Sequence, residues 1–253
     1  MVYFVGAGSG AVDLITVRGA ELLSRADAVI YAGSLVNPEL LDRYARKDCK
    51  RYDSAYLTLE EVLELIKSNE AENALTVRLH TGEPSLYGAV REQMDALDEL
   101  GIEYKSCPGV TACFAAASAL NMEYTLPGVS QSLIITRMEG RTPVPEGESI
   151  ESFAAHGASM AVYLSSGMLQ ELSERLIAGG YSHDTPAAIV YRASWEDEKT
   201  LVCTVGSLAE EAMKNDINRQ AVVLVGSAVA HTAYGRSRLY DPEFETGYRK
   251  AVK

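Results

Sequence analysis

Residues 74–88, ALTVRLHTGEPSLYG, are the stretch that decides the fold. Residues 75–79 are short, apolar-rich and β-prone, which predicts a strand, and a helical pattern over 85–100 follows a turn. Gly82 in that turn allows a positive φ or a close approach of ligand to backbone, and Pro84 suits a helix start. In α/β proteins such a turn lies at the carboxyl edge of a parallel sheet, where ligands bind. An ordinary βα turn without a ligand is the alternative.

The composition narrows the class of protein. The chain has 253 residues, of which 47% are hydrophobic and 23% charged, so it is long enough for one large domain or two ordinary ones. A net charge of −12 argues against a nucleic-acid or membrane-surface binder, since both need a basic footprint. No apolar run approaches the ~20 residues of a membrane span, and the first residues lack the basic start of a signal peptide. We therefore expect a cytoplasmic protein.

Patterns typical of several enzyme classes are missing. The cysteines are scattered without a C-x-x-C pair, and the four histidines lack metal-ligand spacing, so we expect reduced thiols and no resident metal. Neither a G-x-S-x-G nucleophile turn nor a phosphate-binding P-loop occurs. His80 is interpreted as a packed residue rather than a general base. The cysteines are Cys49, Cys107, Cys113 and Cys203.

The first residues resemble a dinucleotide-binding βαβ unit. A strand over 2–5, the glycine-rich run GAGSGA at 6–11, a helix over 16–25 and a strand over 27–31 are expected in that order. The glycines satisfy the G-x-G-x-x-A fingerprint, but the acidic residue that should end the second strand is absent, because Ala32 follows Tyr31. A nicotinamide-dependent oxidoreductase is thus a weak alternative.

Strands and helices alternate along the whole chain, which predicts an α/β fold. A change of composition near residue 127 places a boundary there, giving an N-terminal α/β domain over 1–126 and a C-terminal α/β domain over 127–253. Antiparallel pairing is expected to increase after Trp195. Further helices are expected from Asn37 with Pro38 at its first turn, over 58–69, 112–120, from Ser149, over 169–178 and 207–215; further strands over 102–106, 132–137, 158–164, 187–191, 199–205 and 221–225.

Several blocks of sequence resemble the tetrapyrrole (corrin and porphyrin) methyltransferases. Those typical of the family are VGAGSG at 5–10 with DLIT at 13–16, TGEPSLYG at 81–88 and PGVTA at 108–112. Within the family, YAGSLVNP at 31–38, ITRMEGRTP at 135–143 and VYRASW at 190–195 resemble the group that methylates C11 of precorrin-4 or cobalt-precorrin-4. The resemblance covers almost the whole chain.

The resemblance implies a cofactor, a substrate and an assembly. S-adenosylmethionine is expected in a cleft between two α/β domains, with S-adenosylhomocysteine as its product, a corrin precursor as substrate, and a homodimer. The implied cofactor-binding residues are Thr81, Gly82, Glu83, Leu86, Thr111, Ala112, Leu164, Arg192, Ala193 and Ala221. The implied substrate-binding residues are Asp13, Arg137, Glu139, Arg141 and Thr142. No catalytic acid or base is assigned.

This chemistry agrees with the missing motifs. Methyl transfer from a sulfonium to a carbon nucleophile is an in-line displacement that needs alignment and exclusion of water, not a metal or a covalent nucleophile. Arg137 and Arg141 would bind substrate carboxylates, and surface or interdomain ion pairing is the alternative for both. The chain departs from the family at 9–12, where SGAV replaces PGDP, at Ala32, where relatives acting on uroporphyrinogen have Asp, and at Glu83, where Asp is usual. Another corrin methyltransferase (C17 or C20) and a non-catalytic tetrapyrrole-binding protein are further alternatives.

Overall fold

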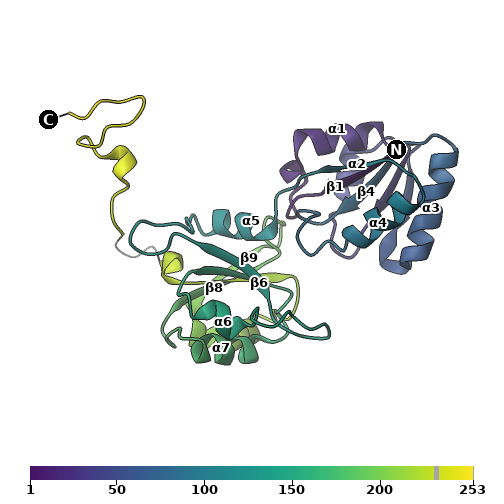
Figure 1. Ribbon diagram of the computed structural model, residues 1–253. Helices are drawn as coiled ribbons and strands as arrows, with labels where there is room; N and C mark the ends of the chain where they lie inside the picture. Colours follow the sequence, from purple (N-terminus) through teal and green to yellow (C-terminus); the bar gives the residue numbers. More distant parts are fainter. Residues whose placement is uncertain (231–233, 253) are drawn as a thin grey trace. The chain divides into compact units, whose positions relative to one another are not determined.

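The computed structural model describes residues 1–230 and 234–252 (Figure 1). The chain divides into two compact units. Unit 1 comprises Met1–Ala115 and Arg192–Asp197; unit 2 comprises Ala116–Tyr191 and Glu198–Lys253. The domain boundary expected between residues 126 and 127 stays a prediction. Within the described ranges, no helix has the length and apolar character needed to cross a membrane.

Unit 1 is built on a five-stranded parallel sheet with strand order β3-β2-β4-β1-β5. All five residues of the central strand β4 are buried, as is usual for a parallel sheet covered on both faces. The carboxyl ends of all five strands lie at one edge. The strands are β1 (Val2–Gly6), β2 (Ala28–Tyr31), β3 (Lys50–Asp53), β4 (Thr76–His80) and β5 (Tyr104–Cys107).

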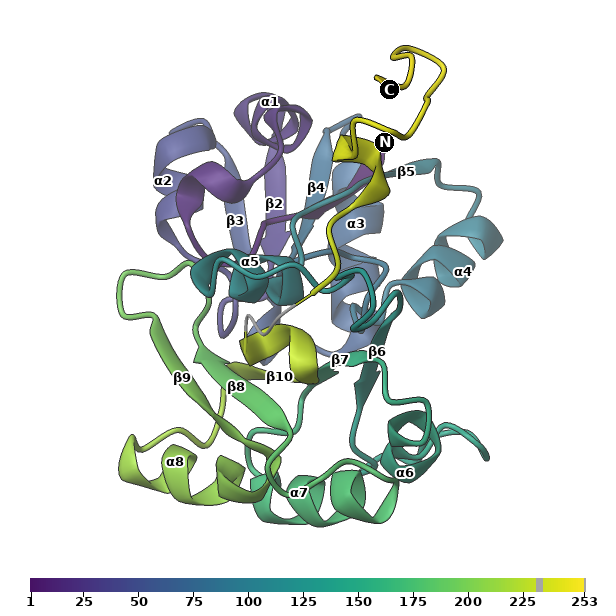
Figure 2. The same cartoon turned by 90° about the vertical axis from the view of Figure 1, so that its left-hand side faces the viewer.

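Helices cover both faces of this sheet (Figure 2). Helices α1 (Val17–Arg25) and α2 (Glu39–Tyr44) bury Leu23 and Leu40 against one face. Helices α3 (Leu59–Ala71) and α4 (Arg91–Glu99) pack on the other face beside Phe4. Short 3-10 turns, η1 (Val12–Leu14) and η2 (Ser54–Tyr56), follow β1 and β3.

The ends of these helices follow the sequence with two differences. Thr58 and Glu61 form the expected capping box at the start of α3. Helix α2 begins one residue later than expected, with Pro38 at the N-cap, while the Asn37 side-chain oxygen accepts the Glu39 N–H at 3.1 Å. The predicted start of the helix at residue 85 was wrong, because residues 84–87 form a turn, residues 88–90 are irregular, and α4 begins only at Arg91.

Unit 2 contains a mixed five-stranded sheet with strand order β6-β7-β10-β8-β9. Only β6 and β7 pair in parallel, and the other three pairings are antiparallel. This agrees with the expected increase in antiparallel pairing toward the end of the chain. Helix α5 (Ala112–Ala119) contains the point where the chain passes from unit 1 to unit 2. The strands are β6 (Leu133–Arg137), β7 (Ser159–Tyr163), β8 (Pro186–Tyr191), β9 (Lys199–Thr204) and β10 (Ala221–Val225).

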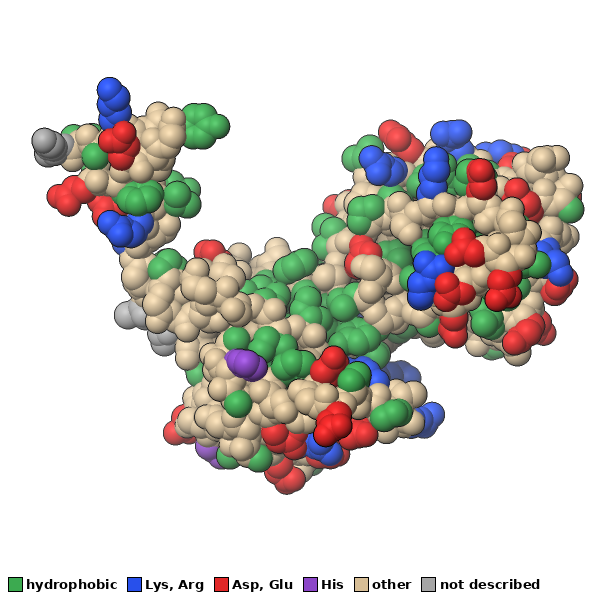
Figure 3. All heavy atoms as spheres, viewed as in Figure 1, with side chains coloured by type: hydrophobic (Ala, Val, Ile, Leu, Met, Phe, Trp, Pro, Cys, Tyr) green, Lys and Arg blue, Asp and Glu red, His purple; other side chains and the backbone are tan. Residues whose placement is uncertain are grey.

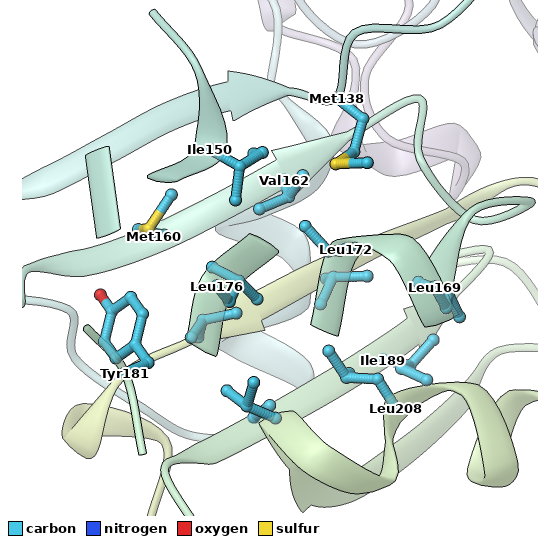
Figure 4. Packing of buried hydrophobic residues seen from close by; sticks show 14 of the residues in the cluster. Met138, Ile150, Met160, Val162, Leu169, Leu172, Leu176, Tyr181, Ile189 and Leu208 are labelled. Carbon is cyan, nitrogen blue, oxygen red and sulfur yellow. The ribbon is translucent and has the colours of Figure 1, made fainter. Parts of the chain in front are cut away.

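One face of this sheet carries the main core of unit 2. Helices α6 (Ile150–Ala154), α7 (Leu169–Ala178) and α8 (Leu208–Lys214) lie along it. Ser149 caps α6 as expected, whereas the Ser207 hydroxyl bonds back to Thr204 instead of capping α8. Further 3-10 turns are η3 (Val205–Ser207), η4 (Ser227–Ala230) and η5 (Arg238–Tyr240). The core side chains that meet there (Figure 4) include Met138, Ile150, Met160, Val162, Leu169, Leu172, Leu176, Ile189 and Leu208.

Candidate functional site

Three glycines at the carboxyl edge of the unit 1 sheet bring three loops into close contact. A Cβ on Gly6 would lie 2.5 Å from the carbonyl oxygen of Gly82 and 2.6 Å from Cα of Gly109. A Cβ on Gly109 would lie 2.1 Å from that same oxygen. Real side chains do not tolerate such distances, so the loops that follow β1, β4 and β5 can pack together only because positions 6 and 109 are glycine.

The Gly82 turn is held by backbone contacts with the first glycine loop (residues 6–11). The Gly82 N–H donates to the Gly8 carbonyl at 2.9 Å, and the Gly8 N–H donates back at 3.4 Å. Gly82 has a φ of +60°, the conformation that the sequence suggested. A Cβ there would stand 3.6 Å from Cα of the buried Thr111, an ordinary van der Waals contact, so Gly82 is needed for its positive φ and not to avoid a clash. Ala112, which follows Thr111, begins α5.

Glu83 ties two of these loops together. One carboxylate oxygen accepts the Gly109 N–H at 2.7 Å, and the other accepts the Ser85 N–H at 3.0 Å and its hydroxyl at 2.8 Å. Partial burial favours a higher pKa for Glu83, but these hydrogen bonds outweigh it and hold the pKa below its usual value. Thr81 is exposed and Leu86 half-buried on either side of this carboxylate. Glu83 therefore shapes the site by supporting its backbone.

His80, at the end of β4, is a neutral packed residue. Burial, with a contribution from the nearby Arg78 charge, lowers its pKa to about 3. Its ring stacks on Phe4 with centroids 6.0 Å apart, and its Nε2 is buried without a hydrogen-bond partner. This agrees with the interpretation from the sequence, because such a group holds no proton at neutral pH.

The first glycine loop is itself filled by protein side chains. The Trp195 indole N–H donates to the Ser9 carbonyl at 3.1 Å, and a Cβ on Gly10 would lie 2.1 Å from the indole ring. The Ala11 N–H donates to the Ser194 hydroxyl at 3.1 Å. A dinucleotide fingerprint needs such loop amides and a close backbone approach for its pyrophosphate. The geometry therefore argues against the nicotinamide alternative.

The remaining expected residues of unit 1 lie near this loop or on its surface. The Arg192 guanidinium stacks 4.1 Å above the Trp195 ring and pairs with Asp197 at 3.1 Å, and its Nε is buried without a partner. Ala193 is buried beside it. Asp13 is exposed on η1, directly after the loop.

A pocket of about 520 Å³ lies at the corresponding edge of the unit 2 sheet. Because β6 and β7 are parallel, Arg137 and the residue after Tyr163 reach the same edge. Leu164 is 66% exposed and has a φ of +53°, which is rare for a non-glycine residue and is often found at functional sites. The pocket is lined by Arg137, Met138, Gly140, Arg141, Thr142, Leu164, Gly167 and Met168.

Three of the five expected substrate residues line this pocket. Their side chains differ in whether they are free to bind a ligand. The Arg137 guanidinium donates to the carbonyls of Met138, Thr142 and Pro143 at 3.0, 3.2 and 2.7 Å, so it holds the loop that follows β6. Arg141, on that loop, is exposed. Glu139 is exposed outside the pocket lining, and its charge acts on Arg175 of α7. Arg141 is thus better placed than Arg137 to bind an anion.

Ala221 is the first residue of β10 and lies at the edge of the unit 2 sheet where β7 ends, because β10 and β7 are antiparallel. Its N–H donates to the Ser166 hydroxyl at 3.3 Å, and that hydroxyl donates to its carbonyl at 3.0 Å. Sequence reasoning overlooked this serine and the pocket residues Gly167 and Met168. A signal was present, since the run SSG directly after a buried strand marks a turn at the ligand-binding edge.

The structure thus brings the expected residues together in two groups. The cofactor candidates of unit 1 surround the Gly82 turn, apart from Arg192 and Ala193, which lie beside the first glycine loop. The substrate candidates Arg137, Arg141 and Thr142 share a pocket with Leu164 in unit 2. Each assignment of a residue to cofactor or substrate stays a prediction.

Comparisons with known proteins agree with this picture. A family model described as Tetrapyrrole (Corrin/Porphyrin) Methylases matches residues 1–209. The cobalt-precorrin-4 C(11)-methyltransferase of Methanocaldococcus jannaschii is 45% identical over 252 residues, covering 100% of this chain and 97% of the relative. The precorrin-4 C(11)-methyltransferase of Sinorhizobium sp is 42% identical and covers 98% of both chains.

Solved structures resemble the fold. The X-ray structure of the cobalamin biosynthetic enzyme cobalt precorrin-4 methyltransferase, CbiF, has a TM-score of 0.88 and 42% identity, covering 90% of this chain and 95% of its own. A uroporphyrin-III C-methyltransferase from Thermus thermophilus, complexed with S-adenosyl homocysteine, has a TM-score of 0.76 at 24% identity and shares the fold. The chain belongs to the family of tetrapyrrole (corrin/porphyrin) methylases.

Proposed function

We propose that this protein transfers a methyl group from S-adenosylmethionine to C11 of precorrin-4 or cobalt-precorrin-4 during cobalamin biosynthesis. The observation that carries the proposal is the full-length relationship to C(11)-methyltransferases, at 45% identity over 100% of this chain. The alternative C17 and C20 reactions lack such support among the relatives described above.

The residues at the Gly82 turn fit the adenosyl cofactor. A Cβ at Gly82 would stand in van der Waals contact with Thr111, 3.6 Å from its Cα, so glycine at this position lets a ligand approach the backbone beside Thr111 more closely. Backbone groups there bind without an opposing charge, because the Glu83 carboxylate is directed to Gly109 and Ser85. We assign Thr81, Gly82, Glu83, Leu86, Thr111 and Ala112 of unit 1 to cofactor binding, with Arg192 and Ala193, and Leu164 and Ala221 of unit 2.

The substrate side is supported by the unit 2 pocket. A corrin precursor carries many carboxylates, and Arg141 is an exposed cation at the pocket. Arg137 acts differently, because its hydrogen bonds to three carbonyls fix the loop that carries Arg141 and Thr142. Exposed Asp13 and Glu139 complete the proposed substrate set.

The chemistry requires positioning more than proton transfer. When bound, S-adenosylmethionine supplies an electrophilic methyl group whose leaving group is a neutral thioether. The protein then has to orient donor and acceptor and exclude water. Neutral His80 is not available as a general acid at neutral pH, since its pKa is about 3. Rigid glycine loops and the Glu83 bridge supply the orientation.

Mass spectrometry of reaction products tests the proposal. Purified protein is incubated with S-adenosylmethionine and a precorrin-4-level tetrapyrrole, with and without cobalt. We expect one added methyl group, located at C11 by fragmentation or NMR. Methylation at C17 or C20, or binding of the tetrapyrrole without methyl transfer, would refute the assignment and favour the corresponding alternative.

A matched pair of glycine variants tests the cofactor site. Gly82→Ala and Gly101→Ala both place a side chain at a positive φ, +60° and +65°, but a Cβ at Gly101 meets nothing within 4 Å. Both should cost about 1 kcal/mol of stability. Only Gly82→Ala should weaken calorimetric binding of S-adenosylhomocysteine, by about tenfold. Equal affinities for both variants would argue against a cofactor beside Gly82.

We further infer a homodimer in the cytoplasm. None of the four cysteines, all within the described part of the chain, forms a disulfide, which supports a reducing compartment. Light scattering coupled to size-exclusion chromatography should give twice the mass of one chain. A monomeric mass across micromolar concentrations would contradict the dimer.

A further inference from the structure

The first glycine loop is held from outside by residues distant in sequence. The Ser194 hydroxyl lies 2.8 Å from the Ser9 hydroxyl and accepts the Ala11 N–H at 3.1 Å. The Trp195 indole N–H donates to the Ser9 carbonyl at 3.1 Å. The Asn37 side-chain amide donates to the Gly10 carbonyl at 3.0 Å. Three consecutive residues of the loop are therefore each fixed by a side chain from elsewhere.

We call the side chains of Asn37, Ser194 and Trp195 the clamp. They connect two of the family-like sequence blocks to the first glycine loop. Asn37 belongs to the block YAGSLVNP at 31–38, while Ser194 and Trp195 belong to VYRASW at 190–195. Residues 192–197 connect β8 to β9 of unit 2, yet they are part of unit 1. Both blocks thus act on one loop, and this loop leads directly into η1, which carries Asp13.

Local geometry shows that the 192–197 segment is built for this contact. Arg192 and Ser194 both have a left-handed φ, +46° and +68°, which is costly for residues other than glycine and persists where surrounding structure enforces it. The Arg192 guanidinium lies over the Trp195 ring, 4.1 Å from its centroid, and is paired with Asp197. The indole therefore contacts both Arg192 and the loop. Gly10 leaves room for the ring, since any Cβ there would overlap it.

We propose that Trp195, together with Ser194 and Asn37, is a positioning residue for the tetrapyrrole: it fixes the backbone of Ser9–Ala11 and so the orientation of Asp13 toward the substrate. This rests on the proposed function, in which Asp13 contacts the substrate. The Ala11 N–H and the carbonyls of Ser9 and Gly10 are hydrogen-bonded to the clamp, so this part of the loop is rigid and does not bind a ligand through these groups. Loosening Ser9–Ala11 changes substrate recognition, whereas the Gly82 turn, held by Gly8 at the start of the loop and by the Glu83 bridge to Gly109, still binds the cofactor.

Variants of the clamp separate positioning from cofactor binding. Trp195→Phe removes the indole N–H and keeps an aromatic ring under Arg192, and Ser194→Ala removes the hydroxyl that accepts the Ala11 N–H. Each should raise the KM for a precorrin-4-level tetrapyrrole about five- to tenfold, the effect of one lost hydrogen bond. Calorimetric affinity for S-adenosylhomocysteine should stay within about twofold of wild type. Ser149→Ala, which removes the cap of α6 in unit 2, is the control and should leave the KM unchanged.

Hydrogen exchange measures how firmly the clamp holds the loop, and it needs no methyl-transfer reaction. Amides of residues 9–14 should exchange faster in Trp195→Phe and Ser194→Ala than in the wild type or in Ser149→Ala. An unchanged KM, or an S-adenosylhomocysteine affinity that falls as much as the KM rises, would overturn the positioning role. So would unchanged exchange in this loop.

Failure of the proposed function would be recognised separately. Trp195 is the only tryptophan of the chain, so its fluorescence reports this loop alone. If the wild type transfers no methyl group, the proposed reaction is wrong, and titration of the fluorescence with the tetrapyrrole still decides the positioning role. Quenching whose midpoint shifts in Ser194→Ala supports that role, and absence of quenching overturns it.

Discussion

At the scale of single residues, charged and polar groups near the site mostly support its backbone. Glu83 and Arg137 illustrate this, because both use their side chains on backbone groups of neighbouring loops. From sequence alone each looks like a ligand-binding charge. A carboxylate that accepts three hydrogen bonds, or a guanidinium that donates three, contributes to binding mainly by fixing other residues.

Replacement of the Glu83 carboxylate should lower stability in a pH-dependent way. Glu83→Gln should cost about 1–2 kcal/mol at pH 7, since it removes charge from the hydrogen bonds to Gly109 and Ser85. The pKa of Glu83 is lowered in the folded protein, so its stabilisation is present above the ordinary value of 4.5 and is lost as the pH falls through the folded pKa. Urea unfolding should show the difference from wild type narrowing below pH 4.5. Exposed Glu92→Gln is the control, and a pH-independent difference would contradict this account.

His80 should make the protein sensitive to mild acid. Its folded pKa of about 3 lies below the ordinary 6.5, so the unfolded chain takes up a proton that the folded chain does not. Stability from this group is complete above pH 6.5 and falls as the pH drops toward 3. His80→Phe should flatten the slope of unfolding free energy between these values by about 1 kcal/mol per pH unit. Identical slopes in urea titrations of both proteins would disprove it.

At the scale of elements, the turn between β4 and α4 shows where sequence reasoning failed. Residues 85–100 have helical periodicity, but Tyr87 and Ala89 adopt positive φ values of 55° and 48°, so the chain turns before the helix starts. Tight packing of Gly88 on Pro84 decides this, and periodicity does not report it. The edge strand β3 was missed for a related reason, because half of its residues are exposed and charged. Long buried elements such as α7 were predicted at their observed bounds.

Gly88 should be essential to that turn. A Cβ at Gly88 would lie 2.2 Å from the carbonyl oxygen of Pro84, so Gly88→Ala forces the backbone apart. We expect a loss of roughly 2–3 kcal/mol in unfolding free energy. Gly247→Ala, where a Cβ meets nothing within 4 Å, is the matched control and should change stability by less than about 0.5 kcal/mol. Similar denaturation midpoints for the two variants would show that the turn relaxes without cost.

At the scale of the whole molecule, net charge and local charge act in opposite directions. The chain carries −12, and acidic and basic side chains are interspersed over the visible surface of unit 1 (Figure 3). A polyanionic tetrapyrrole is repelled by the net charge at long range, whereas Arg141 acts only at the pocket. Net charge therefore affects mainly the rate of encounter.

Salt should accelerate binding of the tetrapyrrole. Raising the ionic strength from about 10 mM to about 150 mM shortens the Debye length to ~8 Å and screens the long-range repulsion. We expect the association rate in stopped-flow absorbance to rise by about two- to fivefold. In Arg141→Gln the increase should be larger, because a compensating local charge is lost. A rate that falls with salt would mean that the local arginines dominate the encounter.

The sequence by itself determined the α/β class, the glycine turns and the family. It could do so because periodicity, turn residues and short motifs report local conformation and burial. Only the tertiary structure decided that Asn37 and Trp195 hold the same loop and that Glu83 bridges to Gly109. It also decided that the Arg137 guanidinium donates its hydrogen bonds to backbone carbonyls. Those partners lie far apart in sequence or on irregular loops, so their pairing depends on how strands and helices pack. That packing is a property of the whole fold and leaves no local pattern.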